Sequence, residues 1–359
     1  MKIPFNNFAR EYASLKSEIE GALQRVMERG HFILGPEVQQ FEKDFAAYNG
    51  VRYGVAVNSG TDALYLSLLA AGIGNGDEVI VPVNTALPTA MAVAMSGASP
   101  VFVDCDESFL IDIHAMAAAI TKITKAIIPV HLYGQACDLD RLRELADRRG
   151  LILIEDCAQA AGAQWRGKKV GSVGDFSAYS FYPTKTLGAY GDGGMILTNS
   201  EEYFKKLQAL RFYGEADRVH SKMFGVNSRL DEMQAAILNV KFKHLDRMNE
   251  RRREIARQYG ELLKSSVCTL PFISNTSEHV YHLFVIRSED RDGLRTRLLE
   301  RGIETLIHYP VLLHRQPFFR TDATFPNAET YATQILSLPL HPYLTDTEVG
   351  YVAEAVRTA

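Results

Sequence analysis

Lys185 stands in a sequence context in which a lysine can act as a nucleophile. It follows an apolar run that predicts a strand at Phe176–Phe181, and a glycine-rich turn, Gly191–Gly194, comes soon after it. A lysine that is desolvated loses part of its preference for the charged form, so it can form a Schiff base or carry a proton. Ser180, just upstream, offers a hydroxyl group to an anion. A lysine taken alone is far more often a solvated surface charge, so this segment needs support from others.

The segment Asn58–Leu64 has the composition of a phosphate-binding turn. It lies between an apolar run at Val55–Val57, which predicts a strand, and a predicted helix. Gly60 lets the backbone turn tightly, Ser59 and Thr61 offer hydroxyl groups, and the amides that open the helix favour an anion. Ser and Thr are also common helix caps, and the segment alone leaves that alternative open.

Two adjacent carboxylates, Glu155 and Asp156, follow an apolar run at Leu151–Ile154 that predicts a buried strand. In open α/β sheets, ligands bind at the edge where the parallel strands end. A fixed and partly desolvated carboxylate at that edge can pair with a cationic ring nitrogen. A helix cap or a surface acid is the alternative.

The segment Gly225–Ala236 places polar residues ahead of a helix that is predicted to begin near Leu230. Ser228 is expected to cap this helix. Capping does not explain Asn227 and Arg229, whose side chains are suited to a phosphate or a carboxylate.

Strands and helices must alternate to bring these segments together, and the hydrophobic pattern predicts that they do. Further predicted strands are Glu78–Val81, Pro100–Val103, Ala126–Val130 and Met195–Thr198. Predicted helices are Asp62–Ala71, Thr89–Ser96, Ile113–Ile120 and Asp138–Arg149, with one earlier helix ending at Gly30 and another following Pro36. Apolar strands that alternate with helices predict an α/β fold with a mainly parallel sheet covered on both faces.

The pattern changes after about residue 230. One long helix is predicted from Asp231 past Tyr259, followed by short strands around His282–Ile286 and helices at Asp292–Arg301 and Thr347–Val356. This is typical of a smaller α+β domain attached through a long connecting helix. We therefore expect a large α/β domain over residues 1–240 and a small C-terminal domain over residues 241–359.

Bulk composition excludes several classes of protein. The 359 residues carry a net charge of −4, which gives no strong field for nucleic acid. The N-terminus lacks the apolar segment of a secretory signal, and the most apolar stretch is too rich in small residues to span a membrane. The four cysteines are scattered without a CxxC pair, which indicates free thiols and no structural zinc site. We expect a cytoplasmic protein with no metal and no membrane or nucleic-acid partner.

Together, the order and spacing of the four segments resemble the DegT/DnrJ/EryC1/StrS family of sugar-nucleotide aminotransferases. Gly35-Pro36-Glu37 near the start and Leu338–Pro342 near the end extend the resemblance over essentially the whole chain. It implies the aspartate aminotransferase-like fold type I of enzymes that use pyridoxal 5'-phosphate (PLP), in a homodimer with shared active sites. It also implies a nucleotide-sugar substrate and an amino-acid donor, expected to be L-glutamate.

The resemblance assigns roles residue by residue. Lys185 matches the catalytic lysine that forms a Schiff base with the cofactor, Asp156 the acid paired with its pyridinium nitrogen, and Gln159 the glutamine beside its ring. The cofactor-phosphate positions are Gly60, Thr61 and Ser180, with Asn227 reaching in from the neighbouring subunit. The substrate-binding positions are Tyr182, Arg229, His308 and Tyr309.

Two features bear on the substrate. Around Lys185, Tyr182 and the Gly191–Gly194 turn resemble the members of the family that act at C-3 of a hexose, whereas C-4 enzymes more often carry a histidine near Tyr182 and a Glu-Gly-Gly turn. Ala86 departs from the family, which usually has an aromatic residue there that stacks on the PLP ring. The expected acceptor is a nucleotide-linked 3-keto hexose, and a 4-keto sugar or a cyclitol is the alternative.

The sequence also bears on three other activities. Sugar 3-dehydratases share the fold but carry histidine at the lysine position, so Lys185 argues against them. A PLP-binding regulator without turnover is an alternative that Lys185, Asp156 and Arg229 make unattractive. A dinucleotide-dependent dehydrogenase needs a G-x-G-x-x-G motif between a strand and a helix, and the sequence has none there.

Overall fold

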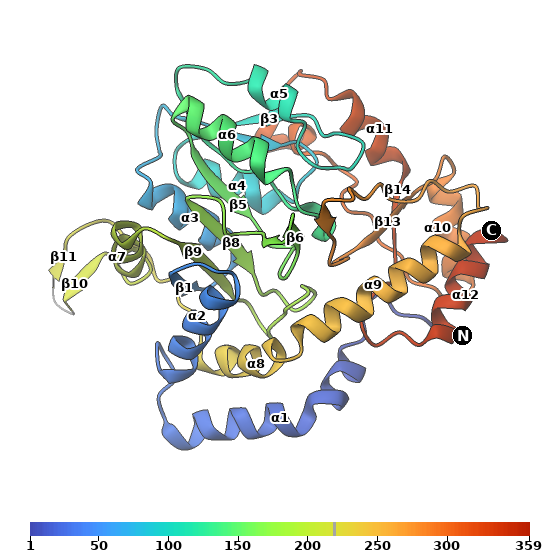
Figure 1. The fold of residues 1–359 in the computed structure, drawn as a ribbon, viewed down its shortest axis with the longest axis horizontal. Coiled ribbons are helices and arrows are strands. Elements are labelled where there is room, and N and C mark those ends of the chain that lie inside the picture. Colours follow the sequence, from blue (N-terminus) through green and yellow to red (C-terminus); the bar gives the residue numbers. More distant parts are fainter. Residues whose placement is uncertain (218–219) are drawn as a thin grey trace.

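A seven-stranded mixed sheet, in the order β1-β9-β8-β5-β4-β2-β3, forms the centre of the protein (Figure 1). The computed structural model describes residues 1–217 and 220–359. The strands are β1 (Tyr53–Val57), β2 (Glu78–Pro82), β3 (Ser99–Val103), β4 (Thr124–Ile127), β5 (Ile152–Asp156), β8 (Phe176–Ser180) and β9 (Gly194–Thr198). Only β9 runs antiparallel to its neighbours, so the α/β fold with a mainly parallel sheet is confirmed.

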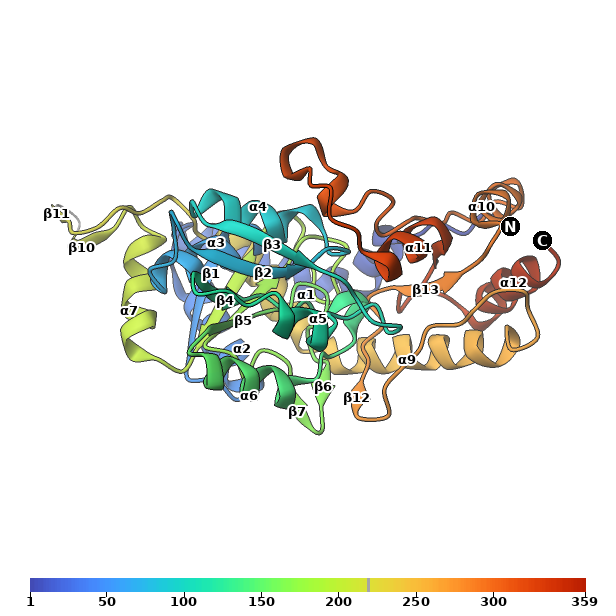
Figure 2. The same cartoon turned by 90° about the horizontal axis from the view of Figure 1, so that it is seen from above.

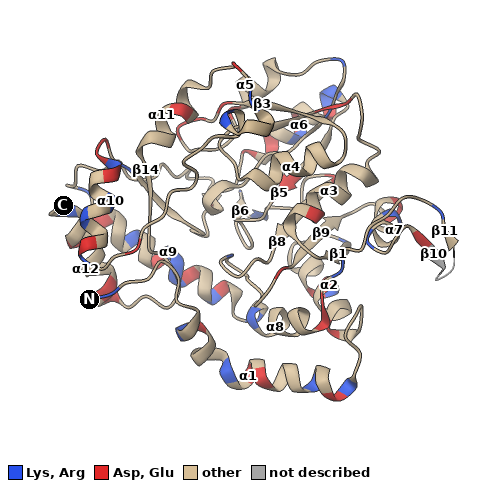
Figure 3. Cartoon of the chain, turned by 180° about the vertical axis from the view of Figure 1, so that it is seen from behind, with Lys and Arg blue, Asp and Glu red and all other residues tan. Residues whose placement is uncertain are grey.

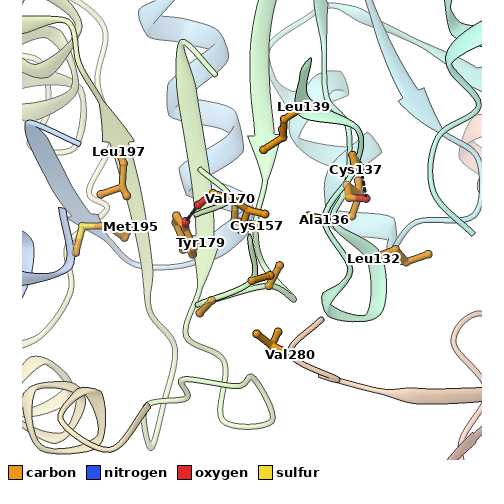
Figure 4. Packing of buried hydrophobic residues seen from close by; sticks show 14 of the residues in the cluster. Leu132, Ala136, Cys137, Leu139, Cys157, Val170, Tyr179, Met195, Leu197 and Val280 are labelled. Carbon is orange, nitrogen blue, oxygen red and sulfur yellow. Dashed lines mark hydrogen bonds between the residues drawn. The ribbon is translucent and has the colours of Figure 1, made fainter. Parts of the chain in front are cut away.

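Helices cover both faces of the sheet, because alternate strand residues point to opposite sides. Val79 and Val81 face a core formed with α3 (Gly60–Ala70), α4 (Leu87–Met95) and α7 (Glu201–Leu210). Ile80, between them, faces a second core with α2 (Pro36–Tyr48), α5 (Ile113–Ala118) and α6 (Leu139–Arg149). Figure 2 shows these layers from above, and Figure 4 shows the packing of Cys157 and Tyr179 in the second core.

Free backbone groups at both ends of the first helix and at the start of the second have hydrogen-bond partners. α1 (Phe8–Arg29) is capped by Asn7 and ends at Gly30, which adopts the left-handed conformation with φ 68°. The N-terminus of α2 is capped from a distance by Glu232, whose carboxylate accepts hydrogen bonds from the backbone N–H groups of Glu37 and Val38. A Cβ atom at Gly35 would lie 2.8 Å from that carboxylate, which explains the glycine before Pro36.

The predicted single helix from Asp231 past Tyr259 is wrong. The structure has two helices there, α8 (Glu232–Phe242) and α9 (Leu245–Leu262), which point in different directions in Figure 1. His244 has φ −104° and ψ −2°, and its N–H bonds to the carbonyl of Lys241, a tighter turn than a regular helix makes. The apolar spacing continues across the break, so the pattern does not reveal it.

Beyond α8, the chain builds a second core around α9. It contains the antiparallel pair β13 (Phe284–Arg287) and β14 (Ile335–Leu338), with α10 (Arg291–Glu300) and α12 (Asp346–Arg357). Ile3, at the other end of the chain, also belongs to this core and bridges to Ile303. The boundary between residues 240 and 241 stays a prediction. The short elements are α11 (Pro326–Gln334), β6 (Gln164–Trp165), β7 (Lys168–Lys169), β10 (Glu215–Asp217), β11 (His220–Ser221), β12 (Ser277–Glu278), and the 3₁₀ turns η1 (Leu132–Gly134), η2 (Leu313–Arg315) and η3 (Pro317–Phe319).

Acidic and basic residues alternate along α1 and α9, as Figure 3 shows. All four cysteines are free and buried. In the ranges that the structure describes, no helix has both the length and the apolar character needed to cross a membrane.

Candidate active site

A cavity of about 380 Å³ lies at the edge of the sheet where the parallel strands end. The loops after β1, β2, β5 and β8 form most of its wall, and residues from the C-terminal part close it. Most of the predicted site residues line this cavity: Gly60, Thr61, Asp156, Gln159, Ser180, Tyr182, Lys185, His308 and Tyr309. This is the edge at which α/β sheets bind ligands, as the sequence predicted.

Lys185 lies in a turn just after β8, where its backbone N–H bonds to the carbonyl of Tyr182 at 2.9 Å. Burial lowers the pKa of Lys185 to about 8, although the charge of Asp156 acts in the opposite direction. Near neutral pH a larger fraction of this amine is therefore uncharged than in an exposed lysine. Such an amine can attack a carbonyl carbon and can take up or release a proton.

Asp156, the last residue of β5, is buried and faces the same cavity. Its Oδ2 accepts a hydrogen bond from the Thr89 hydroxyl at 2.9 Å, and its Oδ1 accepts one from the N–H of Ala158 at 3.1 Å. Burial raises the pKa of Asp156, while these two hydrogen bonds and the charge of Lys185 partly offset the rise. A carboxylate that is desolvated and only partly neutralised gains most from a cationic ligand.

Ser59, Gly60 and Ser180 form a concave corner of the cavity at the N-terminus of α3. The Ser59 hydroxyl accepts a hydrogen bond from the N–H of Asp62 at 3.0 Å, so the cap predicted as an alternative is present. A Cβ atom at Gly60 would lie 2.7 Å from the Cβ of Ser180, so no other residue fits there without displacing β8. The free amides at this helix end favour an anion such as a phosphate.

Gln159 connects two parts of the cavity wall. Its Oε1 accepts a hydrogen bond from the N–H of Tyr133 at 2.7 Å, and its Nε2 donates one to the Tyr309 hydroxyl at 3.1 Å. The Tyr133 hydroxyl in turn donates to the carbonyl of His308. The His308 ring contacts Ser337 at 2.9 Å, and burial, reinforced by Lys185, lowers its pKa to about 4. His308 and Tyr309 are thus fixed against the strand-end loops.

Asn227 and Arg229 do not line the cavity of this chain. Asn227 is exposed, and the Arg229 guanidinium lies 5.0 Å from the centre of the Phe212 ring. The predicted cap at Ser228 is wrong: α8 begins later, and the Ser228 hydroxyl donates to Asp62 at 2.6 Å and accepts from the N–H of Asn58. Ser228 therefore ties this segment to the start of α3 instead.

The sequence assigned no site role to five polar residues of the cavity wall: Thr85, Thr89, Thr184, Asp192 and His282. Thr89 is the first residue of a predicted helix, and Asp192 belongs to the Gly191–Gly194 turn, whose resemblance to the C-3 enzymes gives this residue no separate role. His282 lies at the start of a predicted strand with no motif around it. Ala86 lines the cavity beside Pro88, at the start of α4.

His131, Glu155 and Cys157 form a buried cluster behind the cavity whose geometry resembles a metal site. Burial raises the pKa of the Cys157 thiol well above its usual range, which disfavours the thiolate that binds metals. Glu155 already accepts three backbone hydrogen bonds and contacts His131 at 3.0 Å. This cluster is explained by hydrogen bonding within the fold.

The donor set of the cavity fits PLP. Lys185 offers an amine with a lowered pKa, Asp156 a buried carboxylate for a ring nitrogen, and the corner at Gly60 a place for a phosphate that a Cβ would fill. These three groups lie on the wall of one cavity and on different strand-end loops.

Comparisons with known proteins agree with this chemistry. Residues 13–357 match the DegT/DnrJ/EryC1/StrS aminotransferase family. A pleiotropic regulatory protein from Geobacillus stearothermophilus is 46% identical over 99% of this chain and 98% of the relative. The dTDP-3-amino-3,4,6-trideoxy-alpha-D-glucose transaminase of Streptomyces venezuelae is 44% identical over 99% of this chain and 96% of the relative.

A solved structure is equally similar. The crystal structure of DesV from S. venezuelae, in complex with a ketimine intermediate, superposes with a TM-score of 0.97 at 44% identity. The match covers 99% of this chain and 98% of the other. The expected fold type is confirmed by this likeness.

Proposed function

Because this chain belongs to the DegT/DnrJ/EryC1/StrS aminotransferase family and is a PLP-dependent transaminase, we propose that it aminates C-3 of a nucleotide-linked keto-hexose, with L-glutamate as donor. The observation that carries the proposal is the pair of Lys185 and Asp156 on one cavity wall. One is a half-buried amine whose pKa is lowered to about 8, and the other is a buried carboxylate whose pKa is raised.

The residues of the cavity divide the work between them. PLP, when bound, withdraws electrons from the substrate carbon that carries the nitrogen. In this proposal Lys185 holds the cofactor covalently and, when released, moves a proton at its Nζ. Asp156 keeps a proton on the ring nitrogen, because a buried carboxylate favours a cationic neighbour. Gly60, Thr61 and Ser180 bind the phosphate, and Gln159 holds Tyr309 in the cavity wall.

Two observations favour C-3 over C-4. The Streptomyces venezuelae transaminase is named for a 3-amino sugar. Tyr182 and Asp192, which resemble residues of the C-3 enzymes, both line the cavity near Lys185, where they can set how a hexose lies. The test offers matched 3-keto and 4-keto nucleotide sugars with glutamate and locates the new amine by NMR. Amination at C-4 would contradict the proposed position and leave the transaminase activity standing.

The proposed active site is completed by a second copy of the chain. Among the described residues that line the cavity, Lys185 is the only lysine or arginine, although the cofactor and the nucleotide both carry phosphates. Asn227 and Arg229, which are suited to such groups, lie outside the cavity of their own protomer. A homodimer in which each protomer contributes these residues to its partner's site accounts for both facts.

Subunit exchange tests this assembly. Lys185→Ala and Asn227→Ala homodimers should each be inactive or nearly so. Each mixed dimer carries both substitutions in one site and none in the other. A mixed dimer should therefore have about half of the activity of a wild-type dimer. Verified exchange without any recovery would contradict the shared site.

A second candidate is a PLP-binding regulator, because one relative is named a pleiotropic regulatory protein. The amino-donor half-reaction separates the two candidates. Adding glutamate to the PLP-loaded protein should shift the cofactor absorbance. Borohydride reduction should attach the cofactor covalently to Lys185 alone. Protein that binds PLP but never reacts with glutamate would favour the regulator.

The four free, buried cysteines agree with a reducing compartment, and we propose the cytoplasm.

A further inference from the structure

His282 is a buried histidine on the cavity wall, and only 8% of its surface is exposed. Its Nδ1 is buried and has no hydrogen-bond partner among the residues that the structure describes. An unpaired polar atom in such a place destabilises the fold, so its retention needs an explanation. The roles given to Lys185, Asp156 and Gln159 do not use it.

The backbone on either side of His282 is held firmly against the large sheet's loops. The N–H of Val280 bonds to the carbonyl of Gly134 at 3.0 Å, and the N–H of Leu283 bonds to the carbonyl of Tyr133 at 3.2 Å. Gly134 has φ 101°, and a Cβ atom there would lie 3.0 Å from the backbone nitrogen of His282. The backbone that carries the imidazole is therefore fixed to the η1 turn. The N–H of Tyr133 in this turn also bonds to Gln159.

The surroundings keep this imidazole neutral. Burial lowers the pKa of His282 well below its usual range, and the charges of Lys185 and Arg252 and the neighbouring His308 ring act in the same direction. A neutral imidazole has one nitrogen that donates and one that accepts a hydrogen bond. It suits a neutral hydroxyl group, which can donate and accept, better than a carboxylate or phosphate, which needs a cation.

We propose that His282 forms a hydrogen bond with a hydroxyl group on the hexose ring of the acceptor and thereby helps to decide which sugars are aminated. This inference rests on the proposed nucleotide-sugar activity. Of the two substrates in that activity, the amino-acid donor brings carboxylates, and the hexose brings hydroxyls to the cavity. His282 would then act in the sugar half-reaction and not in the donor half-reaction.

The experiment compares His282→Leu and His282→Gln with a matched control, His279→Leu. His279 lies in the same segment and is equally buried, but it does not line the cavity, and its Nδ1 accepts a hydrogen bond from the N–H of Tyr281 at 2.8 Å. Each holoenzyme is tested in both half-reactions, with glutamate by cofactor absorbance and with the keto-sugar by mass spectrometry. Thermal melting shows how far each protein is destabilised.

His282→Leu should lower kcat/KM for the keto-sugar about tenfold, the size expected for one neutral hydrogen bond. The glutamate half-reaction should stay within about twofold of wild type, the scatter expected at sites that do not interact. His282→Gln, which keeps a donor and an acceptor, should recover part of the loss. His279→Leu should change neither half-reaction, whatever it does to melting.

A series of keto-sugars that each lack one ring hydroxyl identifies the partner. For one sugar in the series, wild type and His282→Leu should become equally slow, because the bond is already missing. Equal slowing of both half-reactions, or a constant ratio across all sugars, would overturn the inference. If His282→Leu does not fold, the same series with His282→Gln decides. Wild-type enzyme that reacts with glutamate but aminates no nucleotide sugar would instead contradict the proposed function.

Discussion

Glu155 and Asp156 are neighbours at the end of β5, both buried, yet their side chains lie in opposite environments. Glu155 points into the core behind the sheet edge and receives the backbone N–H groups of Gly171, Val173 and Gly174, as well as His131. Asp156 faces the cavity and receives one backbone N–H and the hydroxyl of Thr89.

The pKa values of the two carboxylates move in opposite directions as a result. Burial alone would raise the pKa of Glu155, but His131 and the backbone N–H groups of Gly171 and Gly174 reverse the effect and lower it. For Asp156 burial prevails and raises the pKa. The fold therefore supplies Glu155 with enough hydrogen bonds to stabilise its charge. Asp156 lacks such compensation and favours a cationic ligand, as is typical of a binding site.

The largest effect that this comparison predicts is on catalysis, at Asp156. Asp156→Asn should slow the glutamate half-reaction about 100- to 1000-fold, because it removes a charge aimed at the reacting group. The melting temperature of the cofactor-free protein should stay the same or rise, since the cost of burying a carboxylate disappears. Rapid-mixing absorbance and calorimetry measure the two quantities. Near-normal rates would show that the two carboxylates do not differ in function.

Glu155→Gln should have the opposite effect to Asp156→Asn: it should lower stability and leave activity largely unchanged. The amide would bring N–H donors against the backbone N–H groups that now bind the carboxylate, and we expect a loss of about 3 kcal/mol in unfolding free energy. The folded fraction should keep most of its activity. Glu144→Gln, which removes an exposed pair with Arg148, is the control and should cost less than about 0.5 kcal/mol by urea titration. A stable but inactive Glu155→Gln protein would contradict the division of roles.

A smaller effect is expected at Thr89, the side chain that holds Asp156. Thr89→Val keeps the shape but removes the hydrogen bond, so kcat should fall about tenfold, the equivalent of one hydrogen bond to a charged group. The pH at which the rate is half-maximal should shift upward, because the Thr89 hydroxyl lowers the pKa of Asp156. Thr89→Ser should restore both. A lower rate with an unchanged pH profile would indicate a purely structural role.

The sequence predicts the sheet and the strand-end residues well, because these signals are local. Lys185, Asp156 and the Gly60 turn each follow an apolar run directly, and parallel strands bring such ends to one edge. The difference between Glu155 and Asp156 could not be predicted. It depends on partners such as Gly171 and Thr89, whose positions follow only from the three-dimensional packing.

The predictions that the structure contradicts or extends also depend on three-dimensional packing. The break at His244 has no Gly or Pro, and the apolar period continues into α9. Ser228 has the type and position of a helix cap but bonds to Asp62 instead. His282 carries no motif, and only the contact of its segment with Gly134 brings it to the cavity. At Ser228 and His282 the outcome was decided by a residue distant in sequence.

The smallest predicted effect is on the pH dependence of stability, and the two carboxylates should contribute with opposite signs. The folded-state pKa of Glu155 lies below the unfolded value of 4.5, so the stability it contributes is present above that pH and is lost as the pH falls toward the folded value. The folded-state pKa of Asp156 lies above the unfolded value of 3.8, so its ionised form costs stability, and acidification relieves that cost.

Urea unfolding of the cofactor-free protein between about pH 4 and pH 7 reads both contributions. Against wild type, Glu155→Gln should lose less stability on acidification, because a group that must be protonated in the native state is gone. Asp156→Asn should lose more, because the compensating relief is gone. Adding PLP should reduce the difference for Asp156, whose carboxylate then has a cationic partner, and leave that for Glu155 unchanged. Two variants with parallel pH curves would show that the environments differ less than their hydrogen bonds indicate.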